Sequence, residues 1–368
     1  MTNELTDSNN QSSNDSNPES RFIASGAYGC IYHPPYDCKG NDLKDKSYVT
    51  KLVKNDYTSQ TEYDVSKMLK NKDGFLIIEK SCSISSHNIK KSMAQDCDLI
   101  ERKDPNIKNK YLLLYSKYIH GKELVKYMKH NFNIQKLMKA FCFLCKQIET
   151  LIDIKIIHHD LHFGNIMYDT KHNKFIVIDF GLSIIASKFY LNGELNYPYL
   201  NNAIFHYTPT WQYFAVEEHL LSYLVHNGNI TENIIKTTLD QYLSEHIIKD
   251  ISHDYYKKYK EESFKYFKKY VNKPRDVLIK KFLSWWSTWD YYKISLHMIK
   301  IYIKMKIDFP QLYMLLLLMI HPIPKYRPNV VEINKNIQLL LKSYSSKINY
   351  INNFDNKLSE SLYASFFS

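Results

Sequence analysis

The spacing of apolar residues changes along this chain and divides it into three kinds of segment. Residues 1–20 are mostly Asn, Ser, Asp, Thr and Glu with hardly any large apolar side chain. They bury too little surface to offset the entropy of ordering and are predicted to be disordered. From Phe22 to about Tyr118, short apolar runs are typical of strands, and from Gly121 onward apolar residues recur at helical spacing. The pattern predicts an α+β protein.

One helix interrupts the expected strands. In residues 59–69, Glu62, Val65 and Leu69 fall at helical spacing. The five expected strands are residues 22–24, 30–33, 48–53, 75–78 and 111–115. The later helices are expected at residues 137–151, 218–283, 294–305, 311–320 and 330–343, with residues 183–216 irregular.

The chain is predicted to lack a membrane-spanning segment. Its longest apolar run, residues 312–320, is shorter than the ~20 residues that a bilayer requires. Its first residues are polar and lack the apolar centre of a signal peptide. A buried helix is therefore the better interpretation of residues 312–320.

Composition adds information about partners and compartment. The net charge of +11 favours acidic or phosphorylated partners, although a solvated basic surface explains it equally well. Among six cysteines, only Cys142 and Cys145 form a C-x-x-C pair, and they share one face of an apolar helix. Buried thiols are favoured over zinc ligands there. The scattered cysteines indicate a reducing compartment, so we expect a cytoplasmic protein.

Two short stretches carry the candidate chemistry. Residues 158–165 read HHDLHFGN, and residues 178–181 read IDFG. Asn165 therefore follows Asp160 by five positions, and Asp179 follows Asp160 by nineteen. Phosphoryl transfer from ATP uses one carboxylate to orient the attacking hydroxyl and accept its proton. It also uses an amide and a second carboxylate to hold Mg²⁺, which prefers oxygen ligands. Asp160 is the candidate base, and Asn165 and Asp179 are the candidate metal ligands. A metal site at the three nearby histidines is less favoured.

These stretches resemble the catalytic loop and the D-F-G motif of eukaryotic-type protein kinases. The resemblance implies a two-lobed fold that binds ATP and Mg²⁺. The N-lobe would be residues 21–118, with five strands and one helix, and the mainly helical C-lobe would be residues 119–345, followed by a C-terminal extension at 346–368. It also implies that Met167 packs beneath the adenine, and that His158 and Phe180 pack in the core.

The resemblance continues in the first lobe. Residues 24–31 resemble the kinase glycine-rich loop, with Ala24 in place of its first glycine. Gly26 and Gly29 would let backbone N–H groups approach the phosphates, because they carry no Cβ. Ile31 would cover the adenine. Backbone groups of Lys117 and Ile119 would bond the adenine edge, because residues 116–124 resemble the hinge between the lobes.

The phosphate-binding lysine has two candidates. Residues 49–51 resemble the V-A-I-K strand, which makes Lys51 the contact to the α- and β-phosphates. Lys54 competes with it, but Val49 would face the adenine on the same side as Lys51. Glu62 is the expected ion-pair partner of Lys51. The alternative is that both are ordinary solvated residues.

Three later motifs favour a protein kinase. Residues 215–217 resemble A-P-E, with Glu218 as a rival for its glutamate. Residues 289–295 resemble D-x-W-S-x-G, whose aspartate, here Asp290, braces the catalytic loop. Residues 321–328 resemble the late R-P motif, and Arg327 would form a buried bidentate ion pair with Glu217.

Two departures loosen the expected function. His159 replaces the arginine of H-R-D, so the usual partner of an activation-loop phosphate is missing, and we expect activity without loop phosphorylation. His162 replaces the lysine common in serine/threonine kinases. The pattern D-L-H-x-G-N resembles small-molecule and atypical kinases such as aminoglycoside, choline and lipopolysaccharide kinases.

A third departure is an insertion. Glu217 and Asp290 are 73 residues apart, so residues 221–283 or so are additional to the usual kinase pattern. Their Lys- and Tyr-rich stretch would suit an acidic partner, nucleic acid or an anionic membrane face. A helical hairpin with a solvated basic face is the favoured alternative, and nucleic acid is not expected as a partner.

The sequence thus predicts a protein kinase that transfers the ATP γ-phosphate to Ser or Thr of a protein substrate. The alternatives are a small-molecule kinase and a pseudokinase scaffold. Retention of all five polar groups of the ATP site argues against the scaffold: Lys51, Glu62, Asp160, Asn165 and Asp179. The resemblance covers about residues 21–343. The insertion and the composition are similar to kinases of large DNA viruses, which would place the protein in the host cytoplasm or the virion.

Overall fold

The computed structural model describes residues 21–26, 29–91, 93, 97–100, 110–130 and 133–351. The tail at 1–20, Ala27 and Tyr28 of the glycine-rich loop, and residues 352–368 of the expected extension lie outside the described residues. The chain forms two compact units. The first holds the described residues up to Asn55 together with Glu79–Tyr118, and the second holds Asp56–Ile78 and the chain from Ile119 onward. Residues 56–78, which the sequence analysis placed in the first lobe, thus group with the second unit.

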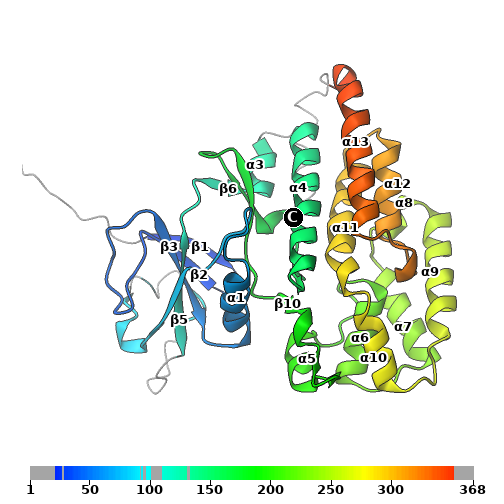
Figure 1. Cartoon of the computed structure of the whole chain (residues 1–368), viewed down its shortest axis with the longest axis horizontal. Coiled ribbons are helices and arrows are strands. Elements are labelled where there is room, and N and C mark those ends of the chain that lie inside the picture. Colours follow the sequence, from blue (N-terminus) through cyan, green and yellow to red (C-terminus); the bar gives the residue numbers. More distant parts are fainter. Residues whose placement is uncertain are drawn as a thin grey trace, which may run out of the picture. The chain divides into compact units, whose positions relative to one another are not determined.

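The first unit is a five-stranded antiparallel sheet (Figure 1). Its order is β1-β2-β3-β5-β4, for β1 (Arg21–Gly26), β2 (Gly29–His33), β3 (Tyr48–Lys54), β5 (Tyr111–Lys117) and β4 (Lys80–Ile84). Alternate residues of its strands, including Tyr32, Leu52 and Leu113, enter one apolar core. This two-residue period is that of strands with one buried face.

The expected strand at residues 75–78 is wrong. Phe75 makes a single bridge to Val177, and the N–H of Ile78 donates to the Ser66 hydroxyl at 2.9 Å. The fourth strand is instead β4, whose sequence KSCSI is largely polar because it lies at the sheet edge. An edge strand carries a weak apolar signal, and the stronger signal of residues 75–78 reflects packing beside a helix.

Two disulfides in the first unit contradict the expectation of reduced cysteines. Cys30 pairs with Cys97 across 67 residues, and Cys38 pairs with Cys82 across 44. Both pairings depend on strands brought together by the tertiary fold, which cysteine spacing does not reveal. The scatter of cysteines is therefore no support for a reducing compartment. Cys142 and Cys145 are free thiols, as predicted, and burial raises the pKa of Cys142 to about 11.

The second unit is mainly helical. Its helices are α1 (Tyr57–Met68), α3 (Leu124–His130), α4 (Ile134–Asp153), α5 (Tyr197–Ala203), α6 (Val216–His226), α7 (Glu232–Leu243), α8 (Ile248–Ile251), α9 (His253–Lys268), α10 (Arg275–Leu283), α11 (Trp289–Lys304), α12 (Pro310–Met319) and α13 (Val330–Ile351). Its short strands are β6 (Gly121–Glu123), β8 (Ile166–Asp169), β9 (Lys174–Val177), β7 (Ile156–Ile157), β10 (Ile184–Ile185), β11 (Tyr190–Leu191) and β12 (Glu194–Leu195). Together with the first unit they make the two-part, kinase-like α+β fold that the sequence predicted.

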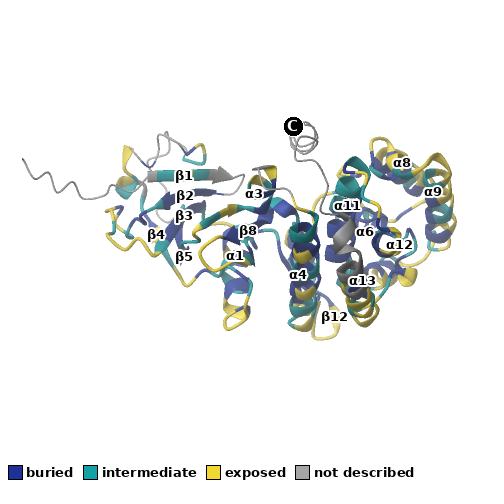
Figure 2. Cartoon of the chain, turned by 90° about the horizontal axis from the view of Figure 1, so that it is seen from above, coloured by how far each residue is buried: buried dark blue, intermediate teal, exposed yellow. Residues whose placement is uncertain are grey.

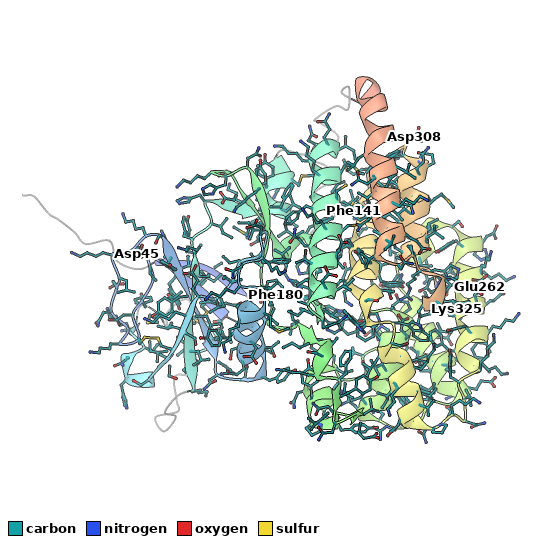
Figure 3. The ribbon with its side chains drawn as sticks, viewed as in Figure 1. Asp45, Phe141, Phe180, Glu262, Asp308 and Lys325 are labelled. Atoms are coloured by element: carbon teal, nitrogen blue, oxygen red, sulfur yellow. A yellow bond between two sulfur atoms is a disulfide. The ribbon has the colours of Figure 1, made fainter. Side chains whose placement is uncertain are left out.

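Local sequence explains where the helices begin and which face they bury. Asp56 caps α1 by accepting the Ser59 N–H at 3.1 Å, and the Ser59 hydroxyl accepts the Asp56 N–H in return. Asn133 caps α4, which buries Phe141 and Ile148 in the main core (Figure 3). The alternation of buried and exposed residues along α4 can be followed in Figure 2.

The Lys- and Tyr-rich insertion is helical, as expected, but it is not a simple hairpin. It comprises α7 to α10, and Tyr259, Tyr266 and Phe267 of α9 pack into the main core. Lysines on the outer side form ion pairs, including Lys260 with Asp240 at 2.6 Å and Lys268 with Glu232 at 3.0 Å. This is the arrangement of a solvated, partly neutralised face. Over the described part of the chain, every helix falls short of the length and apolarity that crossing a bilayer requires.

Candidate active site

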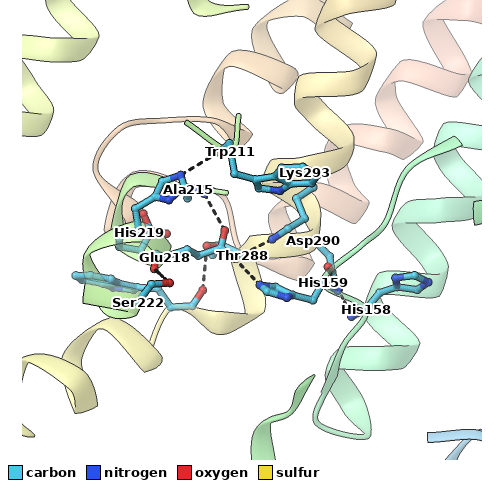
Figure 4. Close-up of polar contacts among 12 residues, drawn as sticks. His158, His159, Trp211, Ala215, Glu218, His219, Ser222, Thr288, Asp290 and Lys293 are labelled. Atoms are coloured by element: carbon cyan, nitrogen blue, oxygen red, sulfur yellow. Dashed lines mark hydrogen bonds and ion pairs between the residues drawn. The ribbon is translucent and has the colours of Figure 1, made fainter. Parts of the chain in front are cut away.

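The catalytic loop is anchored to the first turn of α11. Asp290, 3% exposed, accepts the N–H of His158 at 2.7 Å and the N–H of His159 at 2.9 Å (Figure 4). A buried carboxylate that accepts two N–H groups fixes the backbone of the loop firmly. The bracing role expected for Asp290 is confirmed.

His158 connects the loop to the segment of Asp179. Its Nε2 donates to the Ile178 carbonyl at 3.1 Å, and its ring lies 4.8 Å from that of Phe180. Both side chains are fully buried. The prediction that they pack in the core is confirmed, and it makes His158 a structural residue.

Asp160 and Asn165 lie together. Asn165 Nδ2 donates to the Asp160 backbone carbonyl at 2.8 Å and to its Oδ2 at 3.1 Å. Within the described part of the chain, no hydrogen bond occupies the amide oxygen of Asn165. The amide therefore orients Asp160 through its nitrogen and leaves an oxygen, the donor that Mg²⁺ prefers, for a metal.

His162 and Gly164 shape the turn between them. His162 Nδ1 accepts the Gly164 N–H at 2.9 Å, which caps the 3₁₀ turn Phe163–Asn165. A Cβ on Gly164 would stand 2.6 Å from His162 Cε1. The histidine and the glycine of the D-L-H-x-G-N pattern are thus explained together, because the ring of His162 covers Gly164. Burial lowers the pKa of His162.

Asp179 follows β9 and joins the same region. Ile178 N–H donates to the Asn165 carbonyl at 3.0 Å, and Asp179 and His159 have φ values of 64° and 67°. Such left-handed backbone is uncommon outside glycine and recurs at functional sites. Asp179 Oδ1 and Glu62 Oε2 lie 3.5 and 3.9 Å from the point where a Cβ on Gly181 would stand. The second unit thus pairs Asp160 with Asn165 and places Asp179 and Glu62 beside Gly181.

The first unit arranges its candidate residues on one face of the sheet. Ile31 is directly opposite Lys51, and Val49 lies two residues earlier on the same side as Lys51. Lys54 belongs to the opposite face with Leu52, a residue of the apolar core. This geometry agrees with the choice of Lys51 over Lys54.

The other expected nucleotide contacts can be placed on their elements. Ala24 and Gly26 lie in β1, and Met167 lies in β8. Lys117 ends β5, and the carbonyl of Ile119 accepts the Gly121 N–H at 2.9 Å. A Cβ on Gly29 would meet the Leu52 carbonyl at 3.0 Å, so a larger residue is disfavoured there. The expected Lys51–Glu62 pair joins residues of the two units and stays a prediction.

The late motifs meet in a buried ion pair. Arg327 donates through Nη1 and Nη2 to the two carboxylate oxygens of Glu217, at 2.5 and 3.0 Å, and both side chains are buried. The pairing expected for Arg327 is confirmed, and its partner is Glu217 rather than Glu218.

Glu218 has a separate role that the sequence analysis missed. Its Oε2 accepts Lys293 Nζ at 2.8 Å and His159 Nε2 at 3.2 Å, and its Oε1 accepts the Ala215 N–H at 2.8 Å (Figure 4). Lys293 is 2% exposed. Lys293 follows Asp290 by three positions, so both point from one face of α11, and this spacing was the available signal.

Charge balance explains the protonation of this network. Burial opposes ionisation of Glu218, but Lys293 and His159 outweigh it and hold the pKa of Glu218 at about 2. Burial, together with the Lys293 charge, lowers the pKa of His159. The Glu218–Lys293 ion pair is therefore charged and His159 is neutral at neutral pH. The network ties the catalytic loop to the start of α6.

The three clustered histidines do not form a metal centre. Apart from the gaps in the described chain, no group of three or more His, Cys, Asp or Glu side chains is arranged to hold a metal ion. His158 and His159 are committed to a backbone carbonyl and to Glu218, and His162 caps its own turn. The assignment of Asn165 and Asp179 as Mg²⁺ ligands stays a prediction.

Two comparisons with known proteins agree on a kinase-like domain. The family description "ABC1 atypical kinase-like domain" matches residues 78–191, which include the catalytic loop and the segment of Asp179. The "Probable serine/threonine-protein kinase fnkB" of Dictyostelium discoideum is 36% identical over 76 residues. That match covers 20% of this chain and 14% of the length of the relative. Both matches support a place for the chain in the protein kinase-like superfamily.

Proposed function

We propose that this chain is an ATP-dependent phosphotransferase that phosphorylates Ser or Thr hydroxyls of a protein. The proposal depends on one observation above all. Asn165 holds Asp160 through its amide nitrogen while Asp290 fixes the loop that carries both. A preorganised carboxylate beside candidate metal ligands is what hydroxyl activation for phosphoryl transfer requires.

Each polar residue has a distinct task in this proposal. Asp160 orients the acceptor hydroxyl and accepts its proton, and Asn165 and Asp179 hold Mg²⁺ through oxygen atoms. Bound Mg²⁺ would supply charge neutralisation at the phosphates. Lys51 contacts the α- and β-phosphates, and Glu62 orients Lys51.

The remaining candidate residues hold the nucleotide. The backbone of Gly26 and Gly29 approaches the phosphates. The adenine is enclosed by Ala24, Ile31, Val49 and Met167, and its edge is bonded by the backbone of Lys117 and Ile119.

A small-molecule acceptor is the second candidate. The His162–Gly164 turn and the match to an atypical kinase-like family favour it. The Arg327–Glu217 ion pair favours a protein acceptor, because it joins the two segments that resemble the A-P-E and R-P motifs of protein kinases. We also propose a viral origin for the chain and an acidic partner for its insertion.

We expect activity without phosphorylation of the activation segment. In the usual arrangement an arginine next to the catalytic aspartate binds a loop phosphate. Here His159 contacts the carboxylate of Glu218, which belongs to the chain itself and forms an ion pair with Lys293. Phosphatase treatment should leave the transfer rate within about twofold of the untreated rate, and abolition of activity would refute this point.

The direct test offers γ-labelled ATP to the purified chain with protein and small-alcohol acceptors in parallel. Label on Ser or Thr of protein supports the proposal, and label only on the alcohols supports the second candidate. Asp179→Ala should abolish Mg²⁺-dependent transfer, whereas Asp308→Ala, a change outside the candidate site, serves as the matched control. Transfer by Asp179→Ala at the parental rate would show that the site is misassigned.

A further inference from the structure

A cavity of about 360 Å³ adjoins Asp160 within the second unit. Asp160 and His162 of the catalytic loop line one side, Trp211 and Tyr213 of the segment before α6 line another, and Lys300 of α11 lines a third. Asn165 and Asp179 lie outside the lining. The cavity therefore opens beside the candidate base on a side separate from the candidate metal ligands.

Its volume and walls suit a small part of a larger molecule. Ligand sites of 300–1,000 Å³ or so usually combine apolar walls with a few polar groups. Trp211 is 50% exposed, and the ring of Tyr213 stacks on His297 of α11 at 4.3 Å. The backbone of Trp211 is fixed, because its carbonyl accepts His219 Nε2 at 3.0 Å. An exposed indole on a fixed backbone is a ready contact for the body of an acceptor.

Two of the charged residues that line the cavity form ion pairs. Lys293 pairs with Glu218 at 2.8 Å, and Glu123 pairs with Lys126 at 2.7 Å. Asp160 accepts the Asn165 amide at 3.1 Å and lies 3.9 Å from His162.

Lys300 differs from Lys293, the other lysine of the lining. It is half-buried, and no carboxylate of the described residues forms an ion pair with it. The neighbouring His297 adds no second positive charge, since burial lowers its pKa to about 3 and keeps it neutral. A partly desolvated cation without a counter-charge, in the wall of a cavity, favours an anionic ligand.

We propose that this cavity binds the acceptor and that Lys300 selects a polypeptide bearing a carboxylate or phosphate near the hydroxyl to be phosphorylated. The inference deepens the proposed function and rests on it. Asp160 takes the hydroxyl at one side, Trp211 covers the acceptor chain, and Lys300 binds the anionic group at the other side. Lys300 is thus a specificity-determining residue rather than a catalytic one.

The test uses two matched series of synthetic peptides with a single Ser. One series carries Asp or phosphoserine at each position near the Ser in turn, and the other carries Asn, which has nearly the shape of Asp without the charge. The wild-type chain should prefer the charged peptide about tenfold in kcat/KM at one position or more, mainly through KM. The better anion, Asp or phosphoserine, identifies the source of the negative charge.

Variants separate this inference from the proposed function. Lys300→Met should remove the preference, so that kcat/KM for matched charged and Asn peptides becomes equal within about twofold. Lys146→Met, the same change on the exposed side of α4, should keep the preference. Trp211→Ala should raise KM for charged and neutral peptides alike.

Three results would overturn the inference. In the first, the wild type transfers label but shows no preference. In the second, Lys300→Met keeps the preference. In the third, a small anionic alcohol offered beside the peptides, glycerol 3-phosphate, becomes labelled and none of the peptides does. Absence of transfer to every acceptor would instead refute the proposed function itself.

Discussion

The two compact units differ in the interactions that stabilise each of them internally. The first unit combines an antiparallel sheet with two disulfides, and its core is a small apolar cluster. The second unit has a large helical core that contains the buried ion pairs Glu217–Arg327 and Glu218–Lys293. Covalent links stabilise one unit, whereas buried charge organises the unit that carries Asp160.

This difference has a physical reason. A small sheet buries little apolar surface, so cross-links contribute a large part of its stability. A large helical core can bury charges, which adds little net stability but makes the geometry sensitive to the loss of one partner. We therefore expect the site to depend on paired charges far more than on the disulfides.

Breaking the Arg327–Glu217 ion pair should cause the largest loss of stability. Arg327→Met leaves the buried carboxylate of Glu217 without its partner and should lower the free energy of unfolding by about 3–5 kcal/mol. Urea unfolding followed by circular dichroism measures this. The double variant Arg327→Met, Glu217→Gln should recover part of the loss. A loss below about 1 kcal/mol for the single variant would contradict the buried pair.

Removal of a disulfide should rank next and should act on the first unit. Cys30→Ser opens a loop that spans 67 residues, which is expected to cost about 2–4 kcal/mol. Scanning calorimetry with and without reductant would detect it, and Cys142→Ser on α4 is the control. If alkylation and mass spectrometry find Cys30 and Cys97 as free thiols in the folded protein, the cross-linked description of this unit fails.

Acid should act on the second unit through its buried histidines. Burial lowers the pKa of His246 from 6.5 to about 3, and its ring is fixed as the neutral form by the Gln212 carbonyl and the Ile248 N–H. The unfolded chain binds this proton at a higher pH than the folded chain does. Stability is therefore lost as pH falls below 6.5, by about 2 kcal/mol between pH 7 and 5 for this residue. His246→Gln should flatten that part of the stability–pH curve, and an unchanged slope would count against burial of the neutral ring.

The smallest effect should come from an exposed pair. Lys126 and Glu123 lie 2.7 Å apart but are exposed to solvent and salt. Lys126→Met should change the free energy of unfolding by less than about 0.5 kcal/mol. A loss comparable to that of Arg327→Met would remove the distinction between buried and exposed charge on which the comparison depends.

The sequence predicted the parts of the site that lie close together along the chain. Asp160 and Asn165 occupy one loop, and their spacing indicated the contact that the structure shows between them. Asp290 was also found, because its motif is recognisable at a distance. Local patterns of this kind carry information about geometry.

The missed features depend on contacts between distant segments. Glu218 and Lys293 are 75 residues apart, and the sequence offered Glu218 only as a rival of Glu217. The edge strand β4 is largely polar, so its apolar pattern predicted a strand less strongly than that of residues 75–78 did. The disulfides join cysteines that the sheet, rather than their spacing, brings together.

The most direct test of the account concerns Asp160, the proposed base. Asp160→Asn keeps the size of the side chain but removes the carboxylate that would accept the proton. Its rate of label transfer from ATP should fall about 10²–10⁴-fold while the thermal unfolding midpoint stays unchanged. A variant that folds normally and transfers phosphate within about twofold of the parental rate would contradict the central claim.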